Sequence, residues 1–300
     1  MAIVKKLLLA LAGTAFTVVL TAPGALAGTL VFKGVGADAT TAFNDFKTAI
    51  GGQNNAAQGP QSSGFRTINW DGVRLDGTDV NPKTVVIDPG KTVAIPENRF
   101  RAQGALYAEP YAVSGDGFVS VNPDVNGQFP AFSPKNTFVM FDEESGKFDD
   151  RLIEQSFTLP GTDTPAATRG FGAIFKDVEL AKTSSIEYFN GSKSLGKYYV
   201  DPSATSGDTQ FLGVLFDESI VTDVTLTVGT NAIFSFDGKS FKSFGPENLP
   251  QGIDLAVTDD FAFAEPTKVP EPSTALGAIF VGMVGAVSLL KNQKNNRKIA

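Results

Sequence analysis

The chain has 300 residues, of which 42% are hydrophobic and 19% are charged, and its formal net charge is −7. This length and apolar content exclude a mainly disordered protein and allow either two average domains or one large β-rich domain. The sequence contains no Cys and no His. Disulfides, thiol nucleophiles, histidine bases and the usual zinc ligands are therefore excluded, and the fold must be stabilised by burial.

The first 27 residues have the organisation of a secretory signal peptide. Lys5 and Lys6 precede an uncharged apolar run, and Ala25 and Ala27 are the small residues that signal peptidase requires. We expect cleavage before Gly28. The alternative is an N-terminal membrane anchor, which is disfavoured because the apolar run is short and a cleavage site follows it.

One amphipathic helix is predicted near the start of the exported part, from Asp38 to Ile50. Apolar residues recur there at helical spacing, Asp38 can cap the N-terminus, and Gly51-Gly52 can end the helix. The polar, glycine-rich stretch from Gly52 to Gly64 has no periodicity. It is predicted to be an exposed, mobile loop.

Residues 28–265 are predicted to form a mainly β ectodomain, a β-sandwich with a jelly-roll-like arrangement. Short β-favouring runs separated by turn residues are typical of sandwiches and barrels. Asn190-Gly191 predicts a hairpin turn, and Phe234–Phe241 predicts another. Two sandwiches that meet near residues 130–136 are an open alternative. The clearest runs are Thr84–Ile87, Thr137–Phe141, Gln155–Leu159, Ile186–Phe189, Phe211–Phe216 and Val221–Val228.

One candidate calcium site lies in the middle of the chain. Asn122, Asp124 and Asn126 alternate before Gly127, like the first ligands of a calcium-binding loop. The twelfth position of this pattern is Ser133, where a calcium loop would have Glu. An ordinary Asx turn is the alternative and explains the same residues more simply.

Two other acidic segments are candidate calcium sites, because calcium takes hard oxygen ligands. Asp259-Asp260 lies at the start of the predicted final strand, where an acidic pair can hold a structural ion in jelly-roll folds. The other segment is an acidic loop around two glycines that contains Asp71, Asp76 and Asp79.

Carboxylates are the only catalytic groups that this composition leaves. Adjacent residues on a strand point to opposite faces, so adjacent acids are not expected to flank one bond as glycosidase acids do. We therefore predict that the protein is not an enzyme and that the paired acids are charged loop faces. The pairs are Glu143-Glu144, Asp149-Asp150 and Asp259-Asp260.

The distribution of charge and aromatic residues limits the partners of the exported part. Six of the 25 basic residues lie in the two end segments and all 32 acidic residues lie between them, which leaves a formal charge of −13. Nucleic acid and anionic lipid are therefore unfavourable partners, whereas polysaccharide and divalent cations are compatible. The 25 Phe against 5 Tyr and 1 Trp favour core packing over sugar stacking.

Ser273–Leu290 is predicted to be a weakly apolar transmembrane helix, because it has no charged residue. A helix of this length spans about 27 Å, the lower limit for a bilayer. Its glycines and other small residues suit a transient inner-membrane anchor. The basic residues that follow should stay in the cytoplasm. They are Lys291, Lys294, Arg297 and Lys298.

Val269-Pro270-Glu271-Pro272 stands directly before this helix. The order of Pro-Glu-Pro, apolar helix and basic tail over residues 269–300 resembles the PEP-CTERM sorting signal of Gram-negative bacteria and cyanobacteria. The resemblance implies that residues 266–300 are recognised by an exosortase, a membrane cysteine protease, which removes the helix and releases the protein outward. The two prolines would keep the segment extended. The alternative is an ordinary linker before a permanent anchor.

Several blocks of the ectodomain also resemble secreted proteins that carry PEP-CTERM tails, a group without an assigned activity. The blocks are Ile68–Val73, Phe171–Val178, Ser185–Phe189, Phe211–Val214 and Asp259–Phe261.

The sequence thus predicts a bacterial structural or matrix protein of the biofilm or envelope, secreted or retained at the cell surface, with signal peptidase and exosortase as partners during export. One alternative is a module that binds exopolysaccharide, with or without calcium. A second is a carboxylate-dependent polysaccharide enzyme.

Overall fold

The computed structural model describes residues 28–79, 81, 83–139, 141 and 151–269. Residues as far as Thr267 belong to one unit, and Lys268–Ala300 form another, of which only Lys268 and Val269 are described. The described part is mainly β with antiparallel sheets, as predicted. Its helical elements are α1 (Ala37–Ala49) and the 3₁₀ helices η1 (Arg101–Gln103), η2 (Pro123–Val125) and η3 (Leu249–Gln251).

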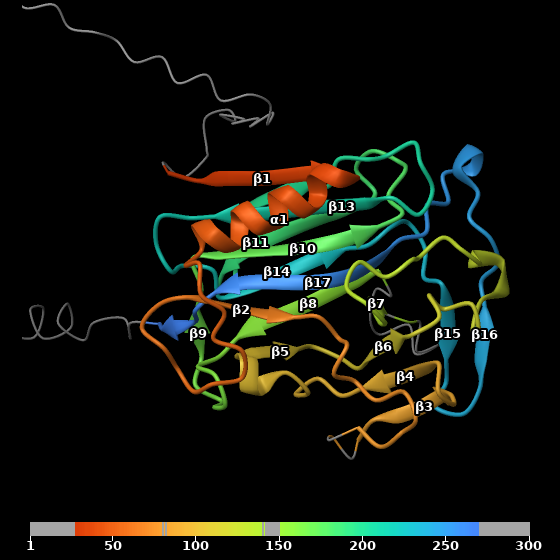
Figure 1. The fold of residues 1–300 in the computed structure, drawn as a ribbon, viewed down its shortest axis with the longest axis horizontal. Helices are drawn as coiled ribbons and strands as arrows, with labels where there is room; N and C mark the ends of the chain where they lie inside the picture. The colour runs from red at the N-terminus through yellow and green to blue at the C-terminus, as the bar shows by residue number, and fades with distance from the viewer. Residues whose placement is uncertain (1–27, 80, 82, 140, 142–150, 270–300) are drawn as a thin grey trace, which may run out of the picture. The chain divides into compact units, whose positions relative to one another are not determined.

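Sheet A combines strands from the beginning, middle and end of the described chain (Figure 1). Strands that precede residue 130 and strands that follow residue 136 are neighbours in it. Its order is β1 (Leu30–Val35), β13 (Thr209–Leu215), β10 (Gly170–Lys176), β17 (Val257–Ala264), β7 (Thr137–Val139), β6 (Tyr111–Ser114), β4 (Thr92–Ile95) and β3 (Val85–Asp88), and β2 (Phe65–Ile68) pairs with β17.

Sheet B is smaller, and short strands lie outside both sheets. The order of sheet B is β12 (Lys193–Tyr199), β11 (Ser185–Asn190), β14 (Asp223–Thr227), β8 (Leu152–Phe157) and β5 (Ala105–Tyr107). The remaining strands are β9 (Ala166–Ala167), the hairpin strands β15 (Phe234–Phe236) and β16 (Phe241–Ser243), and β18 (Thr267–Lys268).

The inner faces of the two sheets pack against each other. The hydroxyl of Tyr188 in β11 donates to the carbonyl oxygen of Phe171 in β10 at 2.9 Å. The ring of Phe157 in β8 lies 5.3 Å from that of Phe263 in β17, measured between centroids. Side chains from both sheets thus form one hydrophobic cluster, in which burial provides the stabilisation that a chain without cysteine needs.

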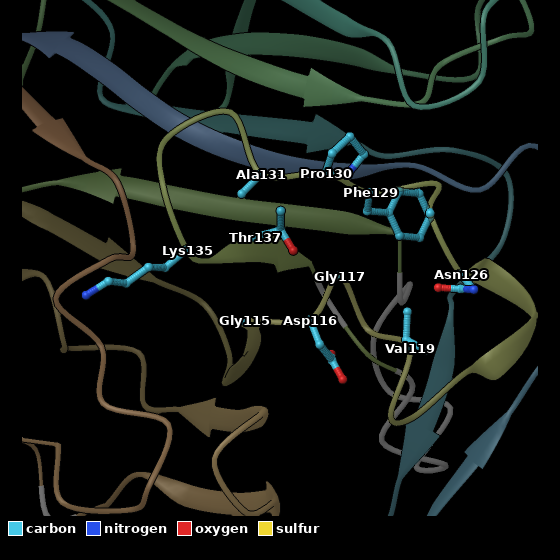
Figure 2. A pocket seen from close by; sticks show the side chains of 11 residues that line it. Gly115, Asp116, Gly117, Val119, Asn126, Phe129, Pro130, Ala131, Lys135 and Thr137 are labelled. Carbon is cyan, nitrogen blue, oxygen red and sulfur yellow. The ribbon is translucent and has the colours of Figure 1, made fainter.

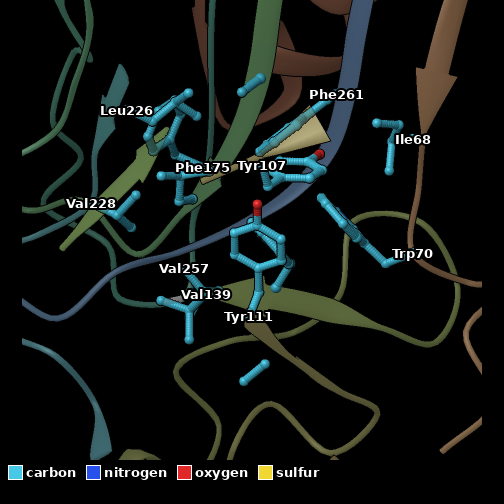
Figure 3. Packing of buried hydrophobic residues seen from close by; sticks show 14 of the residues in the cluster. Ile68, Trp70, Tyr107, Tyr111, Val139, Phe175, Leu226, Val228, Val257 and Phe261 are labelled. Atoms are coloured by element: carbon cyan, nitrogen blue, oxygen red, sulfur yellow. The ribbon is translucent and has the colours of Figure 1, made fainter. Parts of the chain in front are cut away.

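Trp70 packs in the aromatic part of this cluster, near Tyr107 and Phe261 (Figure 3). Its ring stacks on Phe138 with centroids 3.7 Å apart, and Phe100 and Phe261 meet it edge-on. The indole N–H donates to the carbonyl oxygen of Asp259 at 2.6 Å, so its polar atom is satisfied although the residue is only 1% exposed.

Helix α1 covers the outer face of sheet A over β1 and β13 (Figure 1). This helix was predicted, but the predicted cap was wrong. The N-cap is Gly36 with φ 60°, no side chain caps the helix, and Asp38 lies in the first turn. The chain needs glycine there because the left-handed region is costly for other residues.

Two glycines of sheet A allow the helix to lie close to the sheet. A Cβ on Gly34 of β1 would lie 2.3 Å from the carbonyl oxygen of Asp38. A Cβ on Gly213 of β13 would lie 2.7 Å from the Phe211 ring and 3.0 Å from that of Phe46. Since sheet A is covered on both faces, β10 is buried along its whole length.

The six predicted strand runs correspond to β3, β7, β8, β11, β13 and β14, with ends that differ by up to three residues. The predicted hairpin β11–β12 is present, but Gly191-Ser192 forms its turn and Asn190 is the last residue of β11, and the second predicted hairpin is β15–β16. The glycine-rich loop is mostly exposed, as predicted, but it is held at several points. Arg66 donates to the carbonyl oxygens of Ala56, Gln58 and Gly59 and is paired with Glu265.

Candidate functional site

Four carboxylates meet where the segment after β10 approaches the two segments that precede β17. Asp177 and Glu179 follow β10, Glu247 lies between β16 and η3, and Asp254 precedes β17. Oxygen atoms of Asp177, Glu179 and Glu247 lie within 4.8 Å of one another. The carboxylate of Asp254 accepts from the N–H of Glu179 at 3.3 Å. These four residues are called the acidic cluster below.

Backbone and side-chain donors fix the outer oxygens of the acidic cluster. Asp177 accepts from the N–H of Gly207 and from the Ser206 hydroxyl. Glu247 accepts from the N–H of Leu255 at 3.1 Å and from the Gln128 amide at 3.3 Å. Asp254 accepts from two N–H groups and one hydroxyl, those of Glu179, Leu180 and Thr183.

Several oxygens of the cluster are buried without a hydrogen-bond partner. They are Oδ2 of Asp177 and both carboxylate oxygens of Glu179, and Oε1 of the neighbouring Gln128 is also buried without a partner. Asp177 is completely buried, with 0% of its surface exposed. Ionised carboxylates can only accept hydrogen bonds, so neighbouring carboxylates satisfy each other only when one of them holds a proton.

The cluster has no paired basic side chain among the described residues, although Asp177 and the buried Lys176 interact through their charges. Burial raises the pKa of Glu179 to about 10, with a further increase from Asp177. Burial likewise raises the pKa of Glu247 to about 7 and raises the pKa of Asp177. Among the described residues, no Lys or Arg forms an ion pair with any of the four carboxylates. Their charge must therefore be neutralised by protons or by a bound cation.

Asp259 and Asp260 lie at a β-bulge in β17, where two residues oppose the single residue Ile174 of β10. The bulge brings their carboxyl groups within hydrogen-bonding reach of each other. The sequence-based prediction that adjacent acids point to opposite faces is therefore wrong for this pair. The Phe132 N–H and the Ser133 hydroxyl donate to Asp259 at 2.7 and 3.2 Å.

The predicted calcium loop after residue 121 contains an Asx turn. Asn122 is buried, its side-chain oxygen accepts from the N–H of Asp124 at 3.2 Å, and it caps η2. Its amide nitrogen donates to the carbonyl oxygens of Ile233 and Gly245. Asp124 and Asn126 are exposed. These contacts favour the Asx-turn alternative, because the Asn122 amide is already used within the protein.

The acidic loop predicted before β3 has mixed contacts. Asp79 is buried and forms an ion pair with Arg99, with an N–O distance of 2.7 Å. Asp76 accepts from the Thr78 N–H and hydroxyl, and Asp71 accepts from the Asn136 N–H at 3.3 Å. The three side chains thus have separate partners.

Other predicted sites lie outside the described residues. These are the cleavage residues Ala25 and Ala27, the acidic pairs in residues 142–150, and Pro270, Glu271 and Pro272, whereas Val269 is the last described residue. Within the described ranges, no helix is long and apolar enough to cross a membrane. The predicted transmembrane helix over residues 273–290 also lies outside these ranges.

A hollow of about 340 Å³ lies beside β7 (Figure 2). Asp116, Asn126, Lys135 and Thr137 are the polar or charged residues that line it. The hydroxyl of Thr137 is buried without a partner. In Figure 2, Lys135 and Asp116 extend away from Pro130, so the hollow does not gather its charged groups around one point.

The chain has no match among family models, curated proteins or solved structures. The site is therefore defined by its own geometry. Sequence reasoning missed the acidic cluster, although Asp177 and Glu179 alternate directly after the buried strand β10. Glu247 and Asp254 gave no local signal, because only tertiary packing brings them to this place.

Proposed function

We propose that the chain is an exported, exosortase-processed structural protein of the extracellular matrix or cell surface, without catalytic activity. The signal-peptide pattern and the PEP-CTERM resemblance support export and processing. The structural observation that carries the proposal is the burial of Trp70. The only tryptophan of the chain packs in the core, whereas sugar-binding platforms usually use exposed aromatic rings.

The positions of the carboxylates support a structural role. Asp177 and Asp259 each have 0% of their surface exposed, which suits internal contacts better than contact with a polymeric substrate. We also propose that the facing sheets form a jelly-roll-like sandwich. Apart from the β11–β12 hairpin within sheet B and the short strands β9, β15 and β16, the chain alternates between the two sheets from β8 to β17, which supports this arrangement.

The sorting proposal is tested by changing Pro270-Glu271-Pro272 to three alanines in the native host. The natural protein should be released without Lys291–Ala300, as measured by mass spectrometry of the exported form. The alanine variant should remain in the inner-membrane fraction at higher mass. Recovery of the natural protein with its basic tail intact would contradict exosortase processing.

An exopolysaccharide-binding module is the second candidate. The exposed Asn126, which lines the hollow beside β7, favours it, because an amide side chain can form hydrogen bonds with a sugar. A glycan array with and without calcium tests this candidate. Saturable binding that Asn126→Ala weakens would support the binding module, whereas an array without binding by the folded protein would favour the structural role.

A further inference from the structure

We propose that the acidic cluster is a calcium site that fastens three separate segments of the chain together. The ligands would be carboxylate oxygens of Asp177, Glu179 and Glu247, with Asp254 beside them. This inference goes beyond the structural role proposed above, and either can fail without the other. The calcium sites predicted from the sequence lie in other segments of the chain than this cluster.

A feature of Asp177 supports the calcium site independently of the proximity of the carboxylates. This residue is completely buried, and its Oδ1 is held by Ser206 and Gly207. Its Oδ2 is buried without a hydrogen-bond partner, and one of its carboxylate oxygens lies within 4.8 Å of oxygens of Glu179 and Glu247. A buried oxygen without a partner is costly, and a cation at the centre of the cluster would satisfy it.

The composition of the site favours calcium. All candidate ligands are oxygens, and both oxygens of Glu179 are free for bidentate coordination. Calcium accepts six to eight oxygen ligands in flexible geometry, whereas magnesium demands near-ideal octahedral geometry and usually keeps several waters. The partnerless Oε1 of Gln128, whose amide nitrogen donates to Glu247, is a further oxygen donor next to the cluster.

A bound cation would add to the hydrogen bonds that already join these parts of the fold. Asp177 is tied to the loop at Ser206 and Gly207, and Glu247 is tied to Gln128. Calcium would join these contacts to the segment between β16 and β17. Since the ligands come together only when the chain folds, cation binding should appear as stability of the whole domain.

The test uses the full-length protein, purified in detergent and stripped of metal with EDTA. Calorimetric titration with CaCl₂ near neutral pH should show one saturable site per chain, with a Kd of about 10⁻³ M or tighter. At free calcium about tenfold above Kd, Tm should rise by roughly 3–6 °C.

Variants locate the site. Glu179→Gln and Glu247→Gln should each weaken calcium binding at least about tenfold, as expected for loss of a ligand. Glu218→Gln, which changes an exposed carboxylate in another part of the chain, should bind like the natural protein. Asp124→Asn is a second control, because it removes a carboxylate of the alternative loop.

Three results would overturn the proposal. One is the absence of binding at about 10 mM calcium, well above the Kd range of extracellular calcium modules. Another is loss of binding in Asp124→Asn but not in Glu179→Gln. The third is that Glu179→Gln raises the stability of the calcium-free protein while calcium does not raise the stability of the natural protein. Protons alone would then neutralise the cluster.

Discussion

The carboxyl groups of Asp259 and Asp260 lie within hydrogen-bonding reach of each other, although the two residues are neighbours on one strand. Burial raises the pKa of Asp259 to about 8, against the lowering effect of the Phe132 N–H, and the charge of Asp260 adds to the increase. Burial raises the pKa of Asp260, the charge of Asp71 adds to this increase, and the charge of Lys47 opposes it. Burial lowers the pKa of Lys176, and the charge of Asp259 opposes that decrease. At neutral pH this pair therefore holds a proton.

This pair predicts that the domain becomes less stable as pH rises from 5 to 8.5. The unfolded carboxyl titrates near its ordinary pKa of about 4, so between about 4 and 8 the folded state binds more protons than the unfolded state. Stability is then full at low pH and falls by up to about 1.4 kcal/mol per pH unit for each extra proton. Thermal unfolding in EDTA across this range measures the slope.

Asp260→Asn separates this pair from the acidic cluster, whose raised pKa values act in the same direction. The substitution removes the neighbouring negative charge, so the pKa of Asp259 should fall and the loss of stability with pH should become shallower. Parallel curves for the two proteins would show that the pair does not contribute.

Trp70→Ala should destabilise the domain by about 3–5 kcal/mol, the usual cost of truncating a large buried aromatic residue. The variant loses the stack on Phe138 and leaves a cavity among three further rings. Urea unfolding measures the change. Tyr199→Ala is the control, because Tyr199 is 40% exposed and should change stability by no more than about 0.5 kcal/mol. Equal effects would argue against Trp70 as the centre of the core.

Gly34→Ala should cost about 1–3 kcal/mol, because its Cβ would lie 2.3 Å from a backbone oxygen of α1. The helix must move to relieve this overlap, because a backbone atom cannot rotate away as a side chain can. Gly59→Ala is matched to it, since a Cβ there meets no atom within 4 Å. Thermal unfolding should show a clearly lower Tm only for the Gly34 variant.

Glu265→Gln should destabilise the domain by about 3–5 kcal/mol, because it leaves the guanidinium of Arg66 buried without its counter-charge. Both residues are buried, and the carboxylate accepts from Nε and Nη2 of Arg66 at 2.8 Å each. Asp201→Asn breaks the exposed pair with Lys33 and should cost at most about 1 kcal/mol. Comparable losses of stability for the two variants in denaturant titrations would contradict the expectation that the buried ion pair matters more than the exposed one.

The strands and the helix were largely predictable because each has a local pattern. Val224 and Leu226 point into the core, while Thr225 and Thr227 are half-buried, as their alternation predicts. The cap of α1 was not predictable in this way. Asp38 is a suitable capping residue by type, but Gly36 turns the chain two residues earlier with a positive φ.

The sequence by itself determined the β-rich character of the domain, its single amphipathic helix, its hairpins and the expectation of export, because each depends on residues that are close together in the chain. The tertiary structure decided which acids meet. The carboxyl groups of Asp259 and Asp260 lie close together because β17 has a bulge where it pairs with β10. Glu179 and Glu247 meet only because distant loops pack together. Neither strand register nor loop packing is encoded in local periodicity. The contact between the Asp259 and Asp260 carboxyl groups and the assembly of the acidic cluster therefore could not be predicted from sequence.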